Sequence, residues 1–431
     1  MKTEPPSASS SVLSAVRHAF LWLVAGNAIG VMIAVLLLLP ALNVWLGEWT
    51  YGRWMMVHMN VLLFGWCALP MVGILFVAYG AASGRLAAWC RPVVWLWSAA
   101  LAAGAVSWLE GHSSGKLFLD WSGFVRVFFP FALGALWLLL ATSLALNWRA
   151  QSRAVLLAKC AGLLVLLAVP FALYFASNPN VYPAVNPDTG GPIGSSQLDS
   201  SLGMVFILLA MPFALTRMNP AKVFTVRLAW MVLAANAIFC ATLTRTDISH
   251  RLPSQYLGLG TILVWLPLAP AYYNAFQWIP ATKRWRRAFL LWWGALVVSG
   301  WILFLPGILD RFKFTDGLVG HSLTAVAGFL TAYLLFAITQ LVGECDASIV
   351  NGAWAFYAWN LGVLSYVVLF MIAGWIEGAD PAFTMAPSLA RNIFYIVRLL
   401  TGLAMLAASV EWLLSSFSPR ISLVNEGEKA A

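Results

Sequence analysis

A succession of long apolar runs constrains the fold of this chain more than any other feature. We count about twelve runs of roughly 20 residues, the length that one helix needs to cross a bilayer. Because 61% of the residues are hydrophobic and only 10% are charged, a soluble domain is excluded. The sequence predicts an all-α polytopic membrane protein with about twelve transmembrane helices. The runs lie near 20–39, 56–79, 93–108, 124–146, 156–175, 198–215, 224–243, 256–276, 289–309, 318–341, 354–375 and 393–417.

Polar segments set the expected limits of the membrane domain. We expect a polar tail over 1–18, a twelve-helix domain over 19–417 and a second polar tail over 418–431.

Single cysteines without a Cys-x-x-Cys spacing are typical of small core residues rather than metal ligands or disulfides. This expectation applies to Cys67, Cys90, Cys160, Cys240 and Cys345.

The positions of the basic residues predict what the protein contacts and how it is oriented in the membrane. The net charge is +9, but Lys and Arg stand in short loops rather than in one patch, so we expect membrane lipid and no nucleic acid as a partner. The run from Arg284 to Arg287 is typical of an anchor near anionic headgroups. An even number of spans places both termini on one side, and that side has 16 Lys and Arg against 8 opposite. The termini are therefore predicted to be cytoplasmic.

Two histidines are the strongest candidates for function, because an ionisable side chain inside a membrane helix is costly and marks a binding site. His58 and His321 each stand inside an apolar run near its predicted outer end. Arg398 lies about two turns inside the last run. Paired imidazoles at one depth are typical heme ligands, and an arginine suits heme propionates. We therefore expect His58 and His321 as heme-iron ligands and Arg398 as a cofactor-binding residue.

Simpler interpretations stand beside these. Each histidine could hydrogen-bond a neighbouring helix, and Arg398 could pair with Glu377 or Asp380 in an outer loop.

A further polar cluster, Glu110-Gly-His112 with Lys116 and Asp120, is expected to be a solvated loop, or else a partner-docking surface.

Four segments resemble a known family when read in order. They contain His58 with Phe64-Gly-Trp66, then Gly320-His321 with Gly328, then the stretch 359–378, then 397–402. Together they are similar to the large subunit (subunit I) of the heme–copper oxidase superfamily. The resemblance is closest to C-family (cbb-type) cytochrome oxidases and nitric oxide reductase large subunits.

The resemblance implies a subunit I-like bundle in a bacterial inner (plasma) membrane. It makes His58 an axial ligand of a low-spin heme and His321 the ligand of a high-spin heme, with Arg398 near the propionates. It also implies one or two b-type hemes, oxidoreductase activity of the terminal oxidase or nitric oxide reductase type, and a cytochrome c-type partner subunit in respiratory electron transfer.

The chain departs from the family pattern at the metal ligands. Leu323 stands where the second low-spin histidine is expected, and Arg245 and Thr246 replace a histidine pair. The family pattern needs six histidines, whereas this chain has 5. We therefore expect no copper site and assign no catalytic residue. Residues two apart on a helix point about 200° apart, so His321 cannot serve two hemes. One six-coordinate heme, or two hemes with one protein ligand each, is the expected limit.

Two alternatives remain open on the sequence. The chain could be a heme-free, non-catalytic structural pseudo-subunit of a respiratory complex. It could also be a membrane transporter or gas sensor of other ancestry, although the runs have few charges at the bilayer midplane, where transporters place their polar groups.

Overall fold

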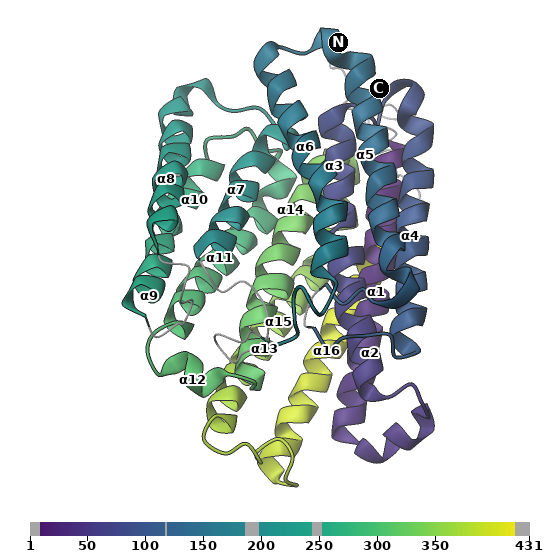
Figure 1. The fold of residues 1–431 in the computed structure, drawn as a ribbon, viewed down its shortest axis with the longest axis vertical. Helices are drawn as coiled ribbons and strands as arrows, with labels where there is room; N and C mark the ends of the chain where they lie inside the picture. Colours follow the sequence, from purple (N-terminus) through teal and green to yellow (C-terminus); the bar gives the residue numbers. More distant parts are fainter. Residues whose placement is uncertain (1–8, 117–118, 186–197, 244–251, 419–431) are drawn as a thin grey trace, which may run out of the picture.

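The computed structural model describes residues 9–116, 119–185, 198–243 and 252–418, and all regular elements in these ranges are helices (Figure 1). The α-helices are α1 (Ser10–Leu38), α2 (Tyr51–Asn60), α3 (Leu69–Tyr79), α4 (Ala87–Leu109), α5 (Phe128–Asn147), α6 (Arg153–Ala176), α7 (Leu198–Leu215), α8 (Val223–Thr242), α9 (Pro253–Gly260), α10 (Trp265–Tyr273), α11 (Lys283–Leu303), α12 (Ile308–Phe312), α13 (Asp316–Leu323), α14 (Thr331–Val342), α15 (Ala353–Glu377) and α16 (Leu389–Ser415). The 3₁₀ and π segments are η1 (Pro40–Leu46), η2 (Val61–Cys67), η3 (Gly84–Leu86), η4 (Gly123–Val127), η5 (Trp148–Ala150), η6 (Pro220–Lys222), η7 (Thr261–Val264), η8 (Pro280–Thr282), η9 (Thr324–Leu330) and η10 (Glu344–Ile349).

Ten helical stretches in the described part of the chain are long and apolar enough to cross a membrane. The chain is thus an all-helical polytopic membrane protein, as the apolar runs predict. The stretches are Ser10–Leu38, Tyr51–Tyr79, Gly84–Leu109, Gly123–Ala150, Arg153–Ala176, Pro220–Thr242, Pro253–Tyr273, Asp316–Val342, Ala353–Glu377 and Leu389–Ser415. Two further predicted runs correspond to α7, an 18-residue helix, and α11, a 21-residue helix that opens on four charged residues among its first five.

The first and last helices pack along each other and close the bundle. Arg17 on α1 donates two hydrogen bonds to the Ser416 carbonyl just after α16, at 3.0 and 2.8 Å. Further along, the Asn27 amide donates to the Ser409 hydroxyl at 3.2 Å. The start of α1 and the end of α16 therefore lie at one end of the bundle (Figure 1), which we call the basic end.

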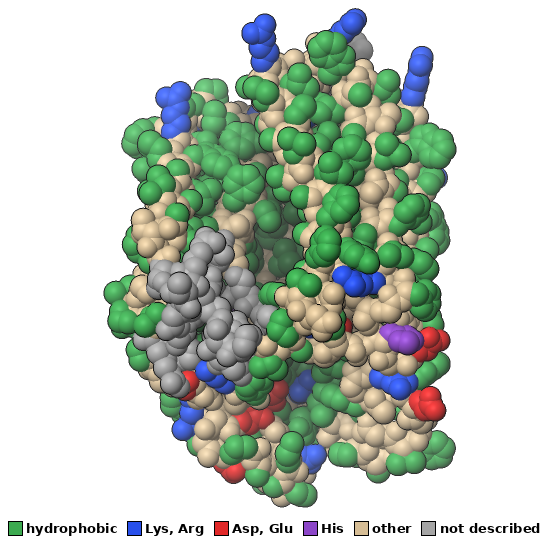
Figure 2. Space-filling model, in the orientation of Figure 1, with side chains coloured by type: hydrophobic (Ala, Val, Ile, Leu, Met, Phe, Trp, Pro, Cys, Tyr) green, Lys and Arg blue, Asp and Glu red, His purple; other side chains and the backbone are tan. Residues whose placement is uncertain are grey.

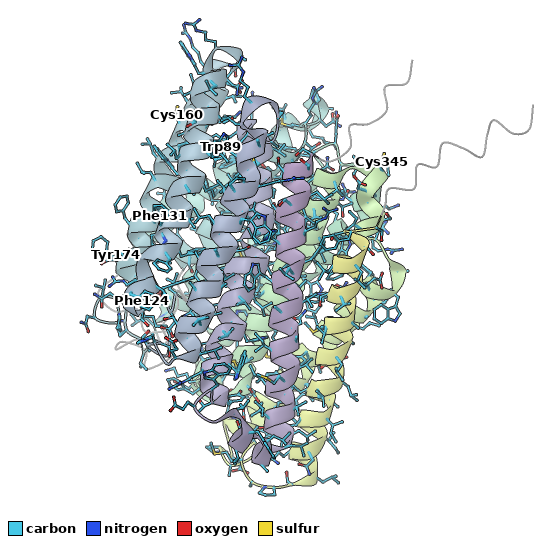
Figure 3. The ribbon with its side chains drawn as sticks, turned by 90° about the vertical axis from the view of Figure 1, so that its right-hand side faces the viewer. Trp89, Phe124, Phe131, Cys160, Tyr174 and Cys345 are labelled. Carbon is cyan, nitrogen blue, oxygen red and sulfur yellow. The ribbon has the colours of Figure 1, made fainter. Side chains whose placement is uncertain are left out.

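Charge is distributed unequally along the bundle axis. Lys and Arg side chains project from the basic end, whereas the acidic side chains visible on this face gather toward the opposite end (Figure 2). The sides between are mostly apolar, and Figure 3 shows Phe131 and Tyr174 extending outward from their helices. Phe131 is 70% exposed, so its ring has no protein neighbour to bury it and suits contact with lipid.

Helix α1 begins well before the apolar run near residue 20. The Ser9 hydroxyl caps the helix by accepting from the Val12 amide. His18 consequently lies inside α1, where it is buried and its Nδ1 lies 2.8 Å from the Ser98 hydroxyl. The apolar runs place only His58 and His321 within spans, whereas the earlier start of α1 adds His18 as a third histidine within a span.

The cysteines divide into two groups. Cys67 and Cys90 are buried, as expected for small core residues, whereas Cys160 and Cys345 are exposed (Figure 3) and Cys240 is half-buried. The prediction that all five are core residues is therefore wrong for Cys160 and Cys345. None of the five forms a disulfide.

The loop after α4 is less solvated than its composition predicts. Lys116 and Asp120 have no exposed surface, although His112 nearby is exposed. Asp120 accepts two 2.7 Å hydrogen bonds, from the amide and the hydroxyl of Ser114, and Lys116 donates to the Ala176 carbonyl at 2.7 Å. Burial lowers the pKa of Lys116, and the carboxylate of Asp120 partly opposes that shift. The solvated interpretation is wrong for these two side chains, because each finds partners inside the protein.

Candidate functional site

His58 is seated in the seam between α2 and α1. Its Nδ1 lies 2.7 Å from the Gly26 carbonyl oxygen. A carbonyl only accepts hydrogen bonds, so Nδ1 carries the proton and Nε2 keeps its lone pair. A Cβ on Gly30 would come within 2.8 Å of the imidazole Cε1. The absence of a side chain at Gly30 therefore leaves the space in which the imidazole packs against α1.

His321 is seated in the same way between α13 and α11. Its Nδ1 lies 3.3 Å from the Ser299 hydroxyl, which itself donates to the Leu296 carbonyl at 3.3 Å. When that hydrogen is directed at Leu296, the hydroxyl accepts from Nδ1–H, and the lone pair is then on Nε2. A Cβ on Gly300 would come within 3.3 Å of the imidazole Cε1. Both histidines thus hold Nδ1 against a polar atom of the neighbouring helix.

A π-helical segment follows each histidine at the same interval. Val61–Cys67 and Thr324–Leu330 both span 7 residues, and each begins three residues after its histidine. Pi-helical turns are rare and are frequently found at functional sites, because the wider turn re-aims nearby side chains. Two of them in equivalent positions are a feature that the apolar pattern did not predict.

A tryptophan supports each π segment from the next helix. The Trp97 indole on α4 donates to the Phe64 carbonyl at 2.7 Å, and the Trp359 indole on α15 donates to the Ala327 carbonyl at 2.9 Å. Both indoles are buried, and both carbonyls stand six residues after the histidine of their span. Each bond supplies a donor to a polar backbone atom in an apolar interior.

The residue after each of these tryptophans accepts from a second indole. Ser98 accepts from Trp22 at 3.1 Å, and Asn360 accepts from Trp292 at 2.9 Å. Trp22 stands eight residues before Gly30 on α1, as Trp292 stands eight residues before Gly300 on α11.

The same two indoles lie against glycines in the π segments. A Cβ on Gly65 would come within 2.5 Å of Trp22, and a Cβ on Gly328 within 2.6 Å of Trp292. Each glycine stands seven residues after its histidine. We call α1, Tyr51–Tyr79 and α4 the His58 unit, and α11, Asp316–Val342 and α15 the His321 unit. The two units therefore have the same arrangement. In the sequence it is visible as two equal spacings, seven residues from each histidine to the glycine of its π segment and eight from each tryptophan to the glycine beside the imidazole.

One hydrogen bond sets the relative level of the two units. The Trp66 indole donates to the Thr331 hydroxyl at 2.9 Å, across the two histidine-bearing spans. Trp66 stands eight residues after His58, and Thr331 ten residues after His321. Two residues of helical rise amount to about 3 Å. Counted from this bond, the two histidines are thus about 3 Å of helical rise apart along their spans.

Arg398 lies on α16 and is only 9% exposed. Its Nε donates to the Tyr366 hydroxyl at 3.1 Å, and its guanidinium lies 4.9 Å from the centre of the Phe370 ring. Its helix, α16, packs against α1 of the His58 unit and α15 of the His321 unit. Arg398 thus lies on a helix that contacts both units.

The alternative pairing of Arg398 is not found. Among the described residues, no ion pair joins it to Glu377 or Asp380. The Glu377 carboxylate instead accepts from the Asp316 amide and the Thr384 hydroxyl, both at 2.7 Å. It caps the first turn of α13, where unpaired amides favour a negative charge.

The donor set suits a cofactor that brings most of its own ligands. Within the described ranges, no group of three or more His, Cys, Asp or Glu side chains lies close enough to hold a bare metal ion. Each imidazole offers one Nε2, which is what a heme iron takes from a protein as an axial ligand. Leu323 packs against the core and has no ligating atom. Arg245, Thr246 and His250 lie outside the described residues.

Comparison with models of known protein families finds no match for this chain, and no curated protein matches its sequence.

Proposed function

We propose that this chain is a heme-binding membrane protein of respiratory electron transfer, similar in design to the large subunit of heme–copper oxidases. The observation that carries the proposal is the matched pair His58 and His321. Both hold Nδ1 against a polar atom of a neighbouring helix, and we assign the Nδ1–H tautomer to both, which leaves Nε2 to bind iron. Arg398, buried on α16 and bonded to Tyr366, would supply the cation for acidic heme substituents.

The arrangement favours two b-type hemes with one protein ligand each. His58 is seated against α1 and His321 against α11, so each imidazole belongs to its own unit. A bound heme would supply one-electron chemistry. The chain itself would hold each iron through one Nε2, offset propionate charge through Arg398, and exclude water with its buried aromatic side chains.

Reduction of dioxygen or nitric oxide is not part of the proposal. The sequence has 5 histidines, too few for both hemes and a second metal in the family pattern. We propose transfer of electrons, received from a cytochrome c-type subunit, in a bacterial inner membrane.

Twelve crossings complete the proposed bundle. Helix α7 packs against α8 and α3, and α11 packs against α14 and the π segment after His321. Helix α11 also supplies the seat of His321 through Ser299. We propose that both cross the membrane with the ten more apolar stretches, which places both termini in the cytoplasm.

Cysteine labelling tests this orientation. Cys345 is exposed in η10, close to the end of α16, so a membrane-impermeant maleimide should label it only in opened cells. A His112→Cys variant without the native cysteines should be labelled in intact cells, because position 112 is exposed at the opposite end. The reverse pattern would invert the orientation.

An optical spectrum tests the heme. The purified protein, expressed with sufficient heme supply and any partner subunit, should show a b-type α-band in a reduced-minus-oxidised spectrum. A pyridine hemochrome assay should give two hemes per chain, falling to about one in His58→Ala or His321→Ala, because each imidazole is the only proposed protein ligand of its iron. A Gly134→Ala variant should keep both hemes, because nothing lies within 4 Å of that position. A colourless wild-type preparation would refute the electron-transfer proposal.

A heme-free structural subunit is the second candidate, and one observation favours it. Both imidazoles already bond a neighbouring helix, which is the role that the simpler interpretation of each histidine gives them. On that candidate the wild-type protein is colourless, and His58→Ala lowers its unfolding temperature without any spectral change.

A further inference from the structure

A groove on the surface of the His321 unit has no role in the proposed function. It lies between α11 and α15 and has a volume of about 880 Å³. That volume is in the range of sites that bind drug-sized or larger ligands. Its walls combine three cations with apolar side chains, and its lining contains no acidic residue.

The cations stand at one end of the groove, in the first turns of α11. Lys283, Arg284 and Arg287 are all exposed. Arg284 is held in place, because it donates to the Asn351 carbonyl at 3.0 Å and lies 5.3 Å from the Phe356 ring centre. Lys283 and Arg287 make no hydrogen bond or ion pair with the described part of the chain. Two cations without a hydrogen-bond or ion-pair partner among the described residues therefore line the mouth of the groove.

The other end of the groove is apolar. Leu291 and Ala295 continue the line of Arg287 along α11, with Leu361 and Leu364 opposite on α15. Ala295 stands eight residues after Arg287, or about 12 Å along the helix. The groove thus changes from cationic to apolar along the bundle axis, starting at the basic end.

We propose that this groove binds an anionic phospholipid. Its phosphate would lie between Lys283, Arg284 and Arg287, and one acyl chain would follow the apolar wall between α11 and α15. Basic pockets between membrane helices on the cytoplasmic side recognise such headgroups, and the order of charge and apolar surface matches a lipid standing in its own leaflet. The assignment is independent of whether heme binds.

Lipid titration monitored by native mass spectrometry tests the headgroup contact. Phosphatidylglycerol and phosphatidylcholine would be added separately to the delipidated protein in detergent. We expect phosphatidylglycerol to bind wild type more tightly. In Lys283→Gln/Arg287→Gln its affinity should fall about 25-fold, because each cation near a headgroup contributes about five-fold. The matched control is Arg149→Gln/Arg153→Gln, which removes two exposed cations outside the groove and should change affinity little.

A second variant tests the acyl-chain contact without altering charge. Ala295→Phe places a ring in the apolar half of the groove, whereas Ala172→Phe places one on the exposed face of α6. We expect only Ala295→Phe to weaken phosphatidylglycerol binding. Equal affinity for the two lipids in wild type, equal losses in the two charge variants, or unchanged binding in Ala295→Phe would each overturn the proposal.

Discussion

The His58 unit and the His321 unit hold their histidines through the same kinds of contact, but the hydrogen-bond partners of the two imidazoles differ. In both, a glycine seats the imidazole, a π segment follows three residues later, and an indole from the next helix donates to a carbonyl inside it. The hydrogen-bond partner of the imidazole Nδ1 differs between the units. It is the Gly26 backbone for His58, at 2.7 Å, and the Ser299 side chain for His321, at 3.3 Å.

The surroundings of the two units differ as well. In the His58 unit, α1 is covered by α16, and Ser98, which accepts from Trp22, also contacts the buried His18. In the His321 unit, Trp292 and its acceptor Asn360 line the groove between α11 and α15. The shared devices are therefore those that seat a histidine. The differences lie where one unit faces protein and the other faces lipid.

The glycines in the π segments should give the largest effects. Gly65→Ala and Gly328→Ala place a methyl group within 2.5 and 2.6 Å of a tryptophan, so each should lower the free energy of unfolding by up to about 3 kcal/mol. Thermal unfolding in detergent would measure both losses. Gly134→Ala, with nothing within 4 Å, should be neutral or slightly stabilising. A loss in only one of the two variants would break the equivalence of the units.

The supporting tryptophans come next. Trp97→Phe and Trp359→Phe each remove the donor to a carbonyl in an apolar interior, at a cost of about 2 kcal/mol. The same unfolding measurement applies, and Trp89→Phe is the control, because Trp89 is 62% exposed (Figure 3). If either buried variant behaves like Trp89→Phe, its indole does not support the π segment.

Substituting the glycines that contact the two imidazoles should lower the free energy of unfolding by unequal amounts. Gly30→Ala brings a Cβ within 2.8 Å of the His58 ring, so the imidazole must move, at a cost of about 1 to 2 kcal/mol. Gly300→Ala reaches only 3.3 Å from the His321 ring, and a cost below about 1 kcal/mol is expected. Unfolding temperatures measured side by side would compare them. Equal losses would mean that the two seats are equally tight.

The fold was predictable because crossing a bilayer leaves few options. A run of roughly 20 apolar residues must be a helix, and an ionisable residue within such a helix is a candidate functional residue. That argument singles out His58, His321 and Arg398 as candidates, and Arg398 stands on α16, which packs against a helix of each unit. The spans of the first and last helices were also found, although α1 begins earlier, at a serine cap that apolar counting ignores.

The remaining features depend on contacts between distant segments. The indole bonds to Phe64 and Ala327 join helices that periodicity alone cannot place side by side. The π segments leave no mark on the apolar pattern, yet the matched spacings of His to Gly and of Trp to Gly were present in the sequence. Lys116 was misjudged for a related reason, because its partner, the Ala176 carbonyl, lies 60 residues away.

The smallest expected effect concerns the one acceptor that a mutation can remove. Ser299→Ala deletes the 3.3 Å hydrogen bond to His321 and should cost about 0.5 to 1 kcal/mol in unfolding, measured against Ser365→Ala on the surface groove of α15 and α16. Without that acceptor, the proton of His321 is free to occupy either ring nitrogen, so heme binding at His321 should weaken while binding at His58 is unchanged. No side-chain substitution can do this to His58, because its acceptor is backbone. A loss of heme from both units in Ser299→Ala would show that the two histidines act as one site.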